Sequence, residues 1–182
     1  EIRQSLVGSE MCIRDSVQRE SKNVRENAGV LDGSTLGKIE IKGKDALAFM
    51  NLIYTNSFSK MKPGTSRYAL MLGEDGMVKD DGIICKISDE HFIATTTTGG
   101  AATVLGCMEE YAQTEWPNLN VYMNSITEQY ATFNISGPKT RNIIEKVFPE
   151  VNFSNEAFPF MTFQFHEYED TPIRILRASF TG

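Results

Sequence analysis

The sequence predicts an α+β fold, in which helices flank an antiparallel sheet and two related units follow each other along the chain. Two observations carry this prediction. Several segments alternate apolar and polar residues with the period of a half-buried strand, and glycine turns and amphipathic helical segments separate them. In addition, a strand–glycine–helix pattern at residues 39–53 recurs at residues 133–147. Internal similarity of this kind is typical of repeated structural units.

The individual elements follow from local patterns. Residues 37–43 alternate Ile39 and Ile41 with charged residues, which predicts a strand. The turn Gly73–Gly76 lies between two apolar segments and predicts a hairpin. We expect strands at residues 37–43, 66–72, 76–87, 91–98 and 173–180, and helices at residues 17–27, 46–54 and 101–113.

The internal repeat predicts the organisation of the second half. Gly43 aligns with Gly137, Phe49 with Ile143, and both patterns read as a strand, a glycine and a helix. Pro138 fits the second copy, because proline is tolerated in the first turn of a helix. We therefore expect two related units that meet near residue 125.

Composition limits the class of protein. The chain has 182 residues, a formal net charge of -6, 41% hydrophobic residues and 23% charged residues, as in soluble globular proteins. The acidic charge argues against a nucleic-acid partner, which needs a basic face. No segment has the length and apolarity of a membrane span or the pattern of a secretory signal, so we expect no membrane contact and a cytoplasmic location. Three cysteines without CxxC spacing and two distant histidines predict no metal site.

The acidic pair Asp80-Asp81 is the first candidate for chemistry. Neighbouring side chains of a strand point to opposite faces, so only one of the two can face a pocket. Alternation groups Asp81 with Ile83 and Cys85, and places Asp80 on the other face. From the residues alone, two carboxylates that are exposed or cap a bulge are the more common arrangement. The alternative is one partly buried carboxylate that binds a ligand nitrogen or moves a proton.

The threonine run at residues 95–98, followed by Gly99-Gly100, is the second candidate. It places hydroxyls and backbone N–H groups at the start of a helix, where a polar or anionic ligand can bind. The same pattern also caps a helix without any ligand. The glycines match neither GxGxxG nor the phosphate-binding loop. The cysteines and histidines carry no pattern of a nucleophile and its base, so we assign them to structure.

Longer motifs carry a resemblance to a known family. The motifs are RENAGVLDGSTLGKIEIKG, RYALMLGEDGMVKDDGI, TTTTGGAATVL, QTEWPNLNVY and FSNEAFPF. Together they resemble the folate-binding, aminomethyltransferase-like region of heterotetrameric sarcosine oxidase alpha subunits, and more distantly the glycine cleavage T-protein. The resemblance covers roughly residues 17–182. The threonine run and the QTEWP and SNEAFPF segments favour sarcosine oxidase over the T-protein.

The resemblance implies a tetrahydrofolate-binding region for one-carbon transfer. In such enzymes the imine from sarcosine oxidation passes to tetrahydrofolate, which gives methylene-tetrahydrofolate, and formaldehyde is released when folate is absent. The implied partners are a small-molecule folate and the beta, gamma and delta subunits of sarcosine oxidase. The flavin and NAD sites belong to other parts of that complex, so we expect this chain alone to be inactive.

The resemblance also assigns site residues. Asp81 stands where the family has the carboxylate that contacts the folate nitrogens. Tyr68 and Met71 stand where a strand of the family lines the pteridine pocket, and Thr97 and Thr98 stand where the next strand approaches the ligand. The predicted site therefore consists of a catalytic Asp81, a folate site formed by Tyr68, Met71, Asp81, Thr97 and Thr98, and no metal ligand.

The two ends of the chain stand apart from the family pattern. Residues 1–16 show no regular period and match nothing in the family, so we expect a foreign segment like a cloning scar. Residues 17–125 are predicted to form the folate-binding unit and residues 126–182 the start of a second α+β unit. Because the family continues beyond the last predicted strand, we expect this second unit to be incomplete.

Two alternative functions stay open at this point. One is a T-protein-like aminomethyltransferase, which would lack the flavin partner. The other is a non-catalytic folate-binding module, which would bind folate without any turnover that depends on Asp81. Neighbouring genes for the beta, gamma and delta subunits would favour sarcosine oxidase.

Overall fold

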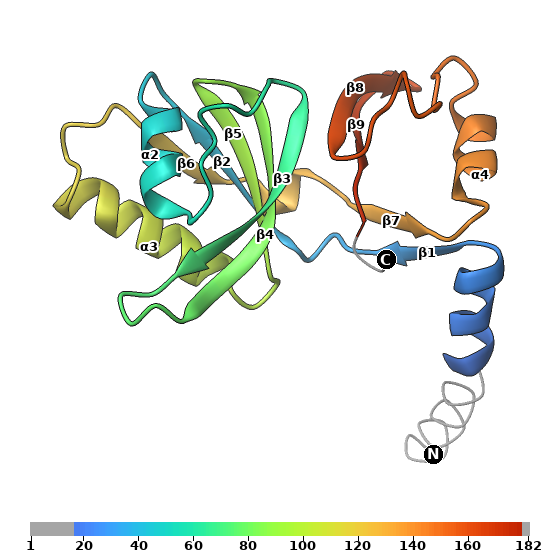
Figure 1. The fold of residues 1–182 in the computed structure, drawn as a ribbon, viewed down its shortest axis with the longest axis horizontal. Coiled ribbons are helices and arrows are strands. Elements are labelled where there is room, and N and C mark those ends of the chain that lie inside the picture. Colours follow the sequence, from blue (N-terminus) through green and yellow to red (C-terminus); the bar gives the residue numbers. More distant parts are fainter. Residues whose placement is uncertain (1–16, 180–182) are drawn as a thin grey trace. The chain divides into compact units, whose positions relative to one another are not determined.

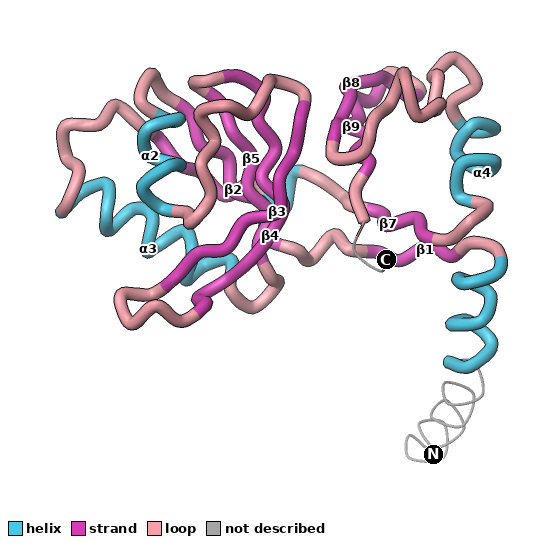
Figure 2. The backbone as a smooth tube through the Cα atoms, viewed as in Figure 1, coloured by secondary structure: helices cyan, strands magenta, loops and turns pink. Residues whose placement is uncertain are grey.

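A computed structural model describes residues 17–179, which form an α+β structure with antiparallel strands (Figures 1 and 2). The predicted fold class is confirmed. The contacts divide these residues into two units. Unit 1 comprises residues 17–32 and 133–157, and unit 2 comprises residues 33–132 and 158–179. The functional boundary at residue 125 stays a prediction.

Unit 2 is built on a sheet of seven strands within the described residues, in the order β6-β2-β5-β4-β3-β8-β9. The strands are β2 (Gly37–Lys42), β3 (Thr65–Leu72), β4 (Val78–Ser88), β5 (His91–Thr96), β6 (Tyr122–Ser125), β8 (Thr162–Tyr168) and β9 (Thr171–Arg177). All neighbouring pairs are antiparallel. The predicted hairpin is β3–β4, and its turn is closed by a hydrogen bond of 2.8 Å from Gly73 N to Met77 O.

Two helices, α2 (Ala46–Ile53) and α3 (Ala101–Thr114), cover one face of this sheet (Figure 1). Each helix turns one apolar stripe toward the sheet, because its apolar residues recur at intervals of three and four. The buried helix residues are Ala46, Phe49, Met50 and Ile53 in α2, and Val104, Cys107 and Met108 in α3. Together with apolar side chains of β2, β3, β4 and β5 they form the main core of unit 2.

The opposite face of the sheet carries a smaller apolar cluster. Its buried members are Cys85, Ile93, Ile126 and Phe163. Ile84 belongs to the main core, whereas Cys85 belongs to this smaller cluster. The faces predicted from alternation along β4 are therefore confirmed.

Unit 1 repeats a strand and a helix of unit 2 in its local structure. It contains helical residues 17–26, the paired strands β1 (Gly29–Asp32) and β7 (Phe133–Ser136), and α4 (Thr140–Val147). In each unit a glycine follows the strand with a positive φ, +138° at Gly43 and +118° at Gly137, and the helix begins three residues later. The predicted strand–glycine–helix repeat is present.

The hydrogen bonds at the start of the two helices correspond as well. Asp45 N donates to Asn120 O at 3.2 Å in unit 2, and Lys139 N donates to Asn27 O at 2.8 Å in unit 1. The burial of the two helices differs. Four residues of α2 are buried in the main core, whereas α4 has no buried residue. The repeat thus preserves the local backbone and not the packing around it.

Some elements were not predicted. The strands β1 and β6 have four residues each, too few to show a period. The strand β8 does alternate Phe163 and Phe165 with polar residues, a signal that the sequence contains. A 3-10 turn, η1 (Thr127–Gln129), follows β6.

The described helices include none that is long and apolar enough to cross a membrane. Residues 1–16 and 180–182 lie outside the described residues. The foreign origin of segment 1–16 therefore stays a prediction.

Replacing Gly43 by Ala is expected to destabilise the protein by about 1–3 kcal/mol, the range for a strained backbone conformation. A φ of +138° is unfavourable for a residue with a Cβ atom, and this Cβ would collide with the carbonyl oxygen of Asn120. Urea denaturation measures the loss. The matched control is Gly99→Ala, because nothing lies near the Cβ position of Gly99. Equal stability of the two variants would contradict the role assigned to Gly43.

Candidate functional site

The β3–β4 hairpin distributes the predicted site residues over both faces of the sheet in unit 2. In β3, Met71 points into the main core, whereas Tyr68 is half exposed. The register places Leu70 opposite Asp81 and Tyr68 opposite Ile83. Tyr68 and Asp81 are therefore diagonal neighbours on one face, a separation that an aromatic side chain can span.

A one-residue bulge interrupts the hairpin at Lys79. Asp80 pairs with Met71, and Val78 pairs with Leu72, so Lys79 is the extra residue of β4. Bulges bend a strand and redirect its side chains. Without a bulge, Lys79 and Asp80 would point to opposite faces of the sheet.

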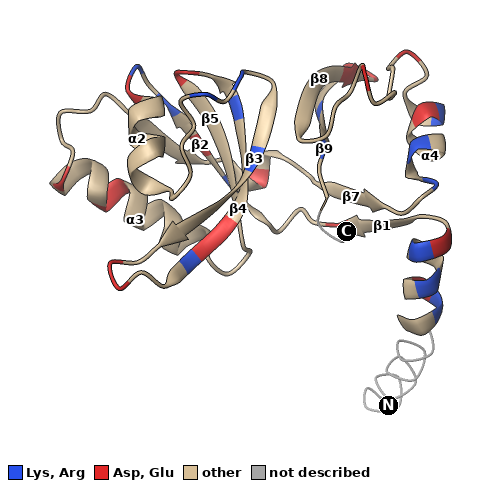
Figure 3. Ribbon diagram, in the orientation of Figure 1, with Lys and Arg blue, Asp and Glu red and all other residues tan. Residues whose placement is uncertain are grey.

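The bulge instead directs two consecutive side chains toward α3. Lys79 Nζ lies 3.1 Å from Cys107 Sγ of α3, and the Asp80 carboxylate lies against Gly100 at the start of the same helix. Asp81 then falls on the opposite face. Figure 3 shows the resulting succession of a basic and then acidic residues along β4.

Asp80 is a buried carboxylate that is only 6% exposed. Its Oδ1 accepts hydrogen bonds from the backbone N–H groups of Asp81 at 2.8 Å and Thr97 at 3.3 Å. One oxygen atom thus joins β4 to the turn that follows β5. Its Oδ2 is buried and has no hydrogen-bond partner in the described part of the chain.

The start of α3 is shaped around Asp80 Oδ2. A Cβ atom at Gly100 would collide with this oxygen, so the close approach requires glycine there. The positive end of a helix dipole stabilises a nearby negative charge. Burial and then the charge of Asp80 raise the pKa of Tyr54 well above its usual value, which reflects how little water reaches this side of the sheet.

Asp81 forms a pair with Tyr68 on the other face. The Tyr68 hydroxyl donates a hydrogen bond of 2.6 Å to Asp81 Oδ2, and this bond raises the pKa of Tyr68. Asp81 is half-buried and Tyr68 is 50% exposed. The pair therefore presents a carboxylate and a flat aromatic ring that a ligand can reach.

The threonines of the predicted site lie at the end of β5. Thr97 is exposed and is bonded to Asp80 rather than to Asp81, because its N–H donates to Asp80 Oδ1. Thr98 is exposed, and its Oγ1 lies 3.2 Å from Thr35 Oγ1. The backbone N–H groups of Thr97 and Asp81 both donate to the Asp80 carboxylate, which links the two residues.

Met71 is not brought together with the Tyr68–Asp81 pair. It is 2% exposed, lies in the main core and points to the opposite face of β3. Its position three residues after Tyr68 on one strand already implies opposite faces. Met71 therefore packs in the main core and helps to hold β3 in place.

Asp80 is a buried carboxylate beside the predicted site that the sequence did not single out. Alternation separated the two faces correctly but did not show which face is more deeply covered. The sequence did not indicate the burial of Asp80, because the covering α3 and the bulge both depend on contacts distant in sequence. The glycine pair before α3 is the local signal that could have indicated a close approach.

Other titratable groups of the sheet form a separate cluster. His91 Nε2 lies 2.9 Å from Glu40 Oε1, and Lys42 Nζ lies 2.8 Å from the same oxygen. Burial and then the Lys42 charge lower the pKa of His91. No group of three or more His, Cys, Asp or Glu side chains within the described residues is placed to hold a metal ion.

The α+β fold of the described residues is shared with a solved aminomethyltransferase. A solved structure of the glycine cleavage system aminomethyltransferase T from Bartonella henselae superposes with a TM-score of 0.74 at 21% sequence identity. The superposition covers 90% of this chain and 42% of that chain. At this level of identity the likeness concerns the fold alone.

Sequence comparison then identifies the family. The model of the GCVT N-terminal domain matches residues 6–182, so the chain belongs to the GCVT N-terminal domain family. The match begins inside the segment 1–16. The resemblance found in the sequence motifs is confirmed at the level of the family.

Named relatives refine the comparison. The sarcosine oxidase subunit alpha of Corynebacterium sp. (strain U-96) is 48% identical over 169 residues, which are 92% of this chain and 18% of that protein. The subunit of the same name from Rhizobium meliloti is 49% identical over 148 residues, 81% of this chain and 15% of that protein. An aminomethyltransferase of Chloroherpeton thalassium is 29% identical over 97% of this chain and 47% of that protein. The chain thus spans less than a fifth of these sarcosine oxidase subunits.

Replacing Asp80 by Ala is expected to lower the free energy of unfolding by about 1–3 kcal/mol, because two backbone N–H donors lose their acceptor. Asp81→Ala is the matched variant and should cost less, since Asp81 accepts from an exposed hydroxyl. Urea denaturation compares the two variants. A larger loss for Asp81→Ala would show that the burial of Asp80 does not contribute to stability.

Replacing Asp81 by Asn is expected to shift the ionisation of Tyr68 to lower pH. The carboxylate and its hydrogen bond raise the pKa of Tyr68, and a neutral amide removes that charge. The tyrosinate absorbance is measured during an alkaline titration, and the difference from Tyr68→Phe isolates this residue. Asp80→Asn is the control and should leave the Tyr68 transition in place, because Asp80 faces the other side of the sheet. An unchanged transition in Asp81→Asn would argue against the pair.

Proposed function

We propose that this chain is the tetrahydrofolate-binding, one-carbon transfer region of a sarcosine oxidase alpha subunit. The identity of 48% to such a subunit, against 29% to an aminomethyltransferase, supports this choice over a T-protein-like enzyme. The observation that carries the site is the Tyr68–Asp81 pair, a reachable carboxylate fixed by a short hydrogen bond. Because the chain spans 18% of that relative, the activity of the whole protein belongs to this proposal as well.

The residues present fit a pterin. A pterin ring offers N–H donors, and Asp81 offers a half-buried carboxylate whose Oδ2 is already held by the Tyr68 hydroxyl. We assign the Oδ1 atom of Asp81 to the ligand nitrogens. The half-exposed ring of Tyr68 offers an apolar surface beside this oxygen.

Side chains of this chain would then bind the ligand and hold a proton during the transfer. Tetrahydrofolate, when bound, supplies the nitrogens that accept the one-carbon unit from oxidised sarcosine. Asp81 would orient the ligand through its N–H groups and hold a proton during the transfer. The Tyr68 hydroxyl would hold the Asp81 carboxylate in position through its hydrogen bond to Oδ2.

The remaining predicted residues would act around this pair. Thr97 and Thr98 would line the approach to the ligand at the end of β5, where both are exposed. Asp80 would hold Thr97 and Asp81 in register through its Oδ1 atom. Met71 would support the strand that carries Tyr68, because it lies in the main core.

The wider complex follows from the same proposal. The beta, gamma and delta subunits would be the partners of the full alpha subunit, with the flavin and NAD sites outside this region. The enzyme would be an oxidoreductase of the cytoplasm with folate-dependent methylene transfer. This region alone would be inactive, because the oxidation that produces the one-carbon unit takes place elsewhere.

Replacing Asp81 by Asn in the complete enzyme is expected to reduce folate-coupled product formation by ~10²-fold or more, the usual scale for a lost acid–base group. Sarcosine oxidation at the flavin should change little, so formaldehyde release should rise in proportion. Product analysis with and without tetrahydrofolate measures both activities in one preparation.

The control for this experiment is Asp170→Asn, a matched substitution in the turn between β8 and β9, where asparagine tolerates the observed φ of 61°. It should leave both activities unchanged. If Asp80→Asn uncouples the activities and Asp81→Asn does not, the assignment is wrong by one residue. Folate binding without coupled turnover in the unmodified enzyme would instead favour the non-catalytic module, and methylene transfer without any sarcosine oxidation would favour the aminomethyltransferase.

A further inference from the structure

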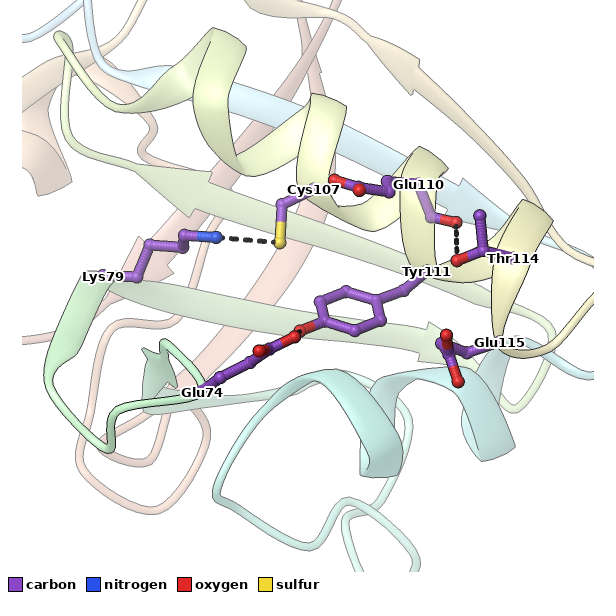
Figure 4. A pocket seen from close by; sticks show the side chains of 7 residues that line it. All are labelled: Glu74, Lys79, Cys107, Glu110, Tyr111, Thr114 and Glu115. Carbon is purple, nitrogen blue, oxygen red and sulfur yellow. Dashed lines mark hydrogen bonds between the residues drawn. The ribbon is translucent and has the colours of Figure 1, made fainter.

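A cavity of about 200 Å³ lies between α3 and the tip of the β3–β4 hairpin in unit 2 (Figure 4). Its lining includes Lys79 from the bulge of β4, Glu74 from the hairpin turn, and Cys107, Glu110 and Tyr111 from α3. None of these residues belongs to the proposed folate site. The cavity is large enough to admit a small polar molecule to the Cys107 side chain.

Lys79 and Cys107 face each other in this cavity. The Lys79 ammonium donates a hydrogen bond of 3.1 Å to Cys107 Sγ, and this bond raises the pKa of Lys79. Cys107 is 7% exposed, whereas Lys79 is exposed. The Cys107 sulfur thus lies within reach of both the Lys79 nitrogen and the cavity. The position of Lys79 depends on the bulge, which turns its side chain toward α3.

Cys85 provides an internal comparison. It is buried in the smaller apolar cluster, and its burial raises the pKa of Cys85 to about 11. A buried thiol of this kind is unreactive at neutral pH, because the thiolate is the reactive form. The two buried cysteines of the described residues therefore have opposite chemical surroundings.

We propose that Lys79 and Cys107 form an oxidation-sensitive pair, in which a hydroperoxide oxidises the thiol and the lysine amine captures the product as a covalent S–N link. In the first step the sulfur attacks a peroxide oxygen, an S–O bond forms and the O–O bond breaks. The sulfur is oxidised by two electrons to a sulfenic acid, and the peroxide is reduced to water or an alcohol.

In the second step the Lys79 ammonium first gives one proton to Glu110, whose charge acts on Lys79, and the resulting amine nitrogen attacks the same sulfur. An S–N bond forms, the S–O bond breaks, and the hydroxyl group leaves as water with a second proton from the nitrogen. Condensation of a sulfenic acid with a nitrogen is an established reaction, and here the nitrogen already lies at 3.1 Å from the sulfur.

The link would join the bulge of β4 to the middle of α3. Both elements also meet at Asp80 and Gly100. In the oxidised protein, the covalent link between Lys79 and Cys107 would therefore lie beside the packing contact between Asp80 and Gly100, which the reduced protein already makes. The inference does not depend on folate or on sarcosine.

Peptide mass spectrometry after treatment with hydrogen peroxide tests the proposal. The protein carries Cys12→Ser throughout, so that the cysteine outside the described residues does not compete. We expect a cross-linked peptide that contains Lys79 and Cys107 and is two hydrogens lighter than the sum of its parts. A thiol reductant should reverse it. Oxidation of Cys107, trapped with a dimedone reagent at early times, should be at least ~10-fold faster than that of Cys85.

Three variants separate the two steps. Cys107→Ser should abolish both the sulfenic acid and the link, whereas Cys85→Ser should leave both intact. Lys79→Arg keeps the charge but lacks the amine, so it should accumulate the sulfenic acid without forming the link. Far-ultraviolet circular dichroism verifies that each variant is folded. The proposal is overturned if Cys107 reacts no faster than Cys85, or if its sulfenic acid forms in the unmodified protein without a link to Lys79.

Discussion

The buried carboxylate of Asp80 is the contact on which the geometry of the site depends. Removing a carboxylate from water costs several kcal/mol unless the charge is compensated. Here two backbone N–H donors and the start of α3 provide the compensation, and they tie β4 to the turn that leads from β5 into α3. Within the described residues Oδ2 has no hydrogen-bond partner, so the compensation there is incomplete. Because burying this carboxylate costs free energy, we expect Asp80 to be needed for the positions of the residues around it.

The internal repeat shows how far local sequence determines structure. Gly43 and Gly137 adopt the same left-handed conformation, and the helices that follow them start with corresponding hydrogen bonds. These features need only a glycine, a short strand and a helical pattern. Burial needs a partner: Phe49 of α2 is fully buried under the sheet, whereas its counterpart Ile143 of α4 is exposed. The two copies therefore share a backbone and differ in the apolar contacts that stabilise it.

The same distinction explains what the sequence could predict. Alternation and turn residues predicted β2, β3, β4 and β5, because each depends on neighbours in the chain. The Tyr68–Asp81 contact lies within one hairpin, but it was not predicted, because the strand register that makes the two residues diagonal neighbours comes from the structure. The bulge at Lys79 could not be read in this way, since it depends on how β4 meets both β3 and α3. Met71 is a different case, because the period of a strand alone places it opposite Tyr68.

The bulge also determines which parts of unit 2 can influence each other. It places Lys79 and Asp80 on the side of α3, and Asp81 on the side of Tyr68. The backbone N–H of Asp81 donates to the Asp80 side chain. A shift of α3 against β4 would therefore first displace Asp80, and through it Asp81 on the opposite face of the sheet. Packed elements transmit such shifts because protein interiors leave little free volume. The Asp80 carboxylate therefore connects α3, the helix that contains Cys107, to Asp81 of the proposed ligand site.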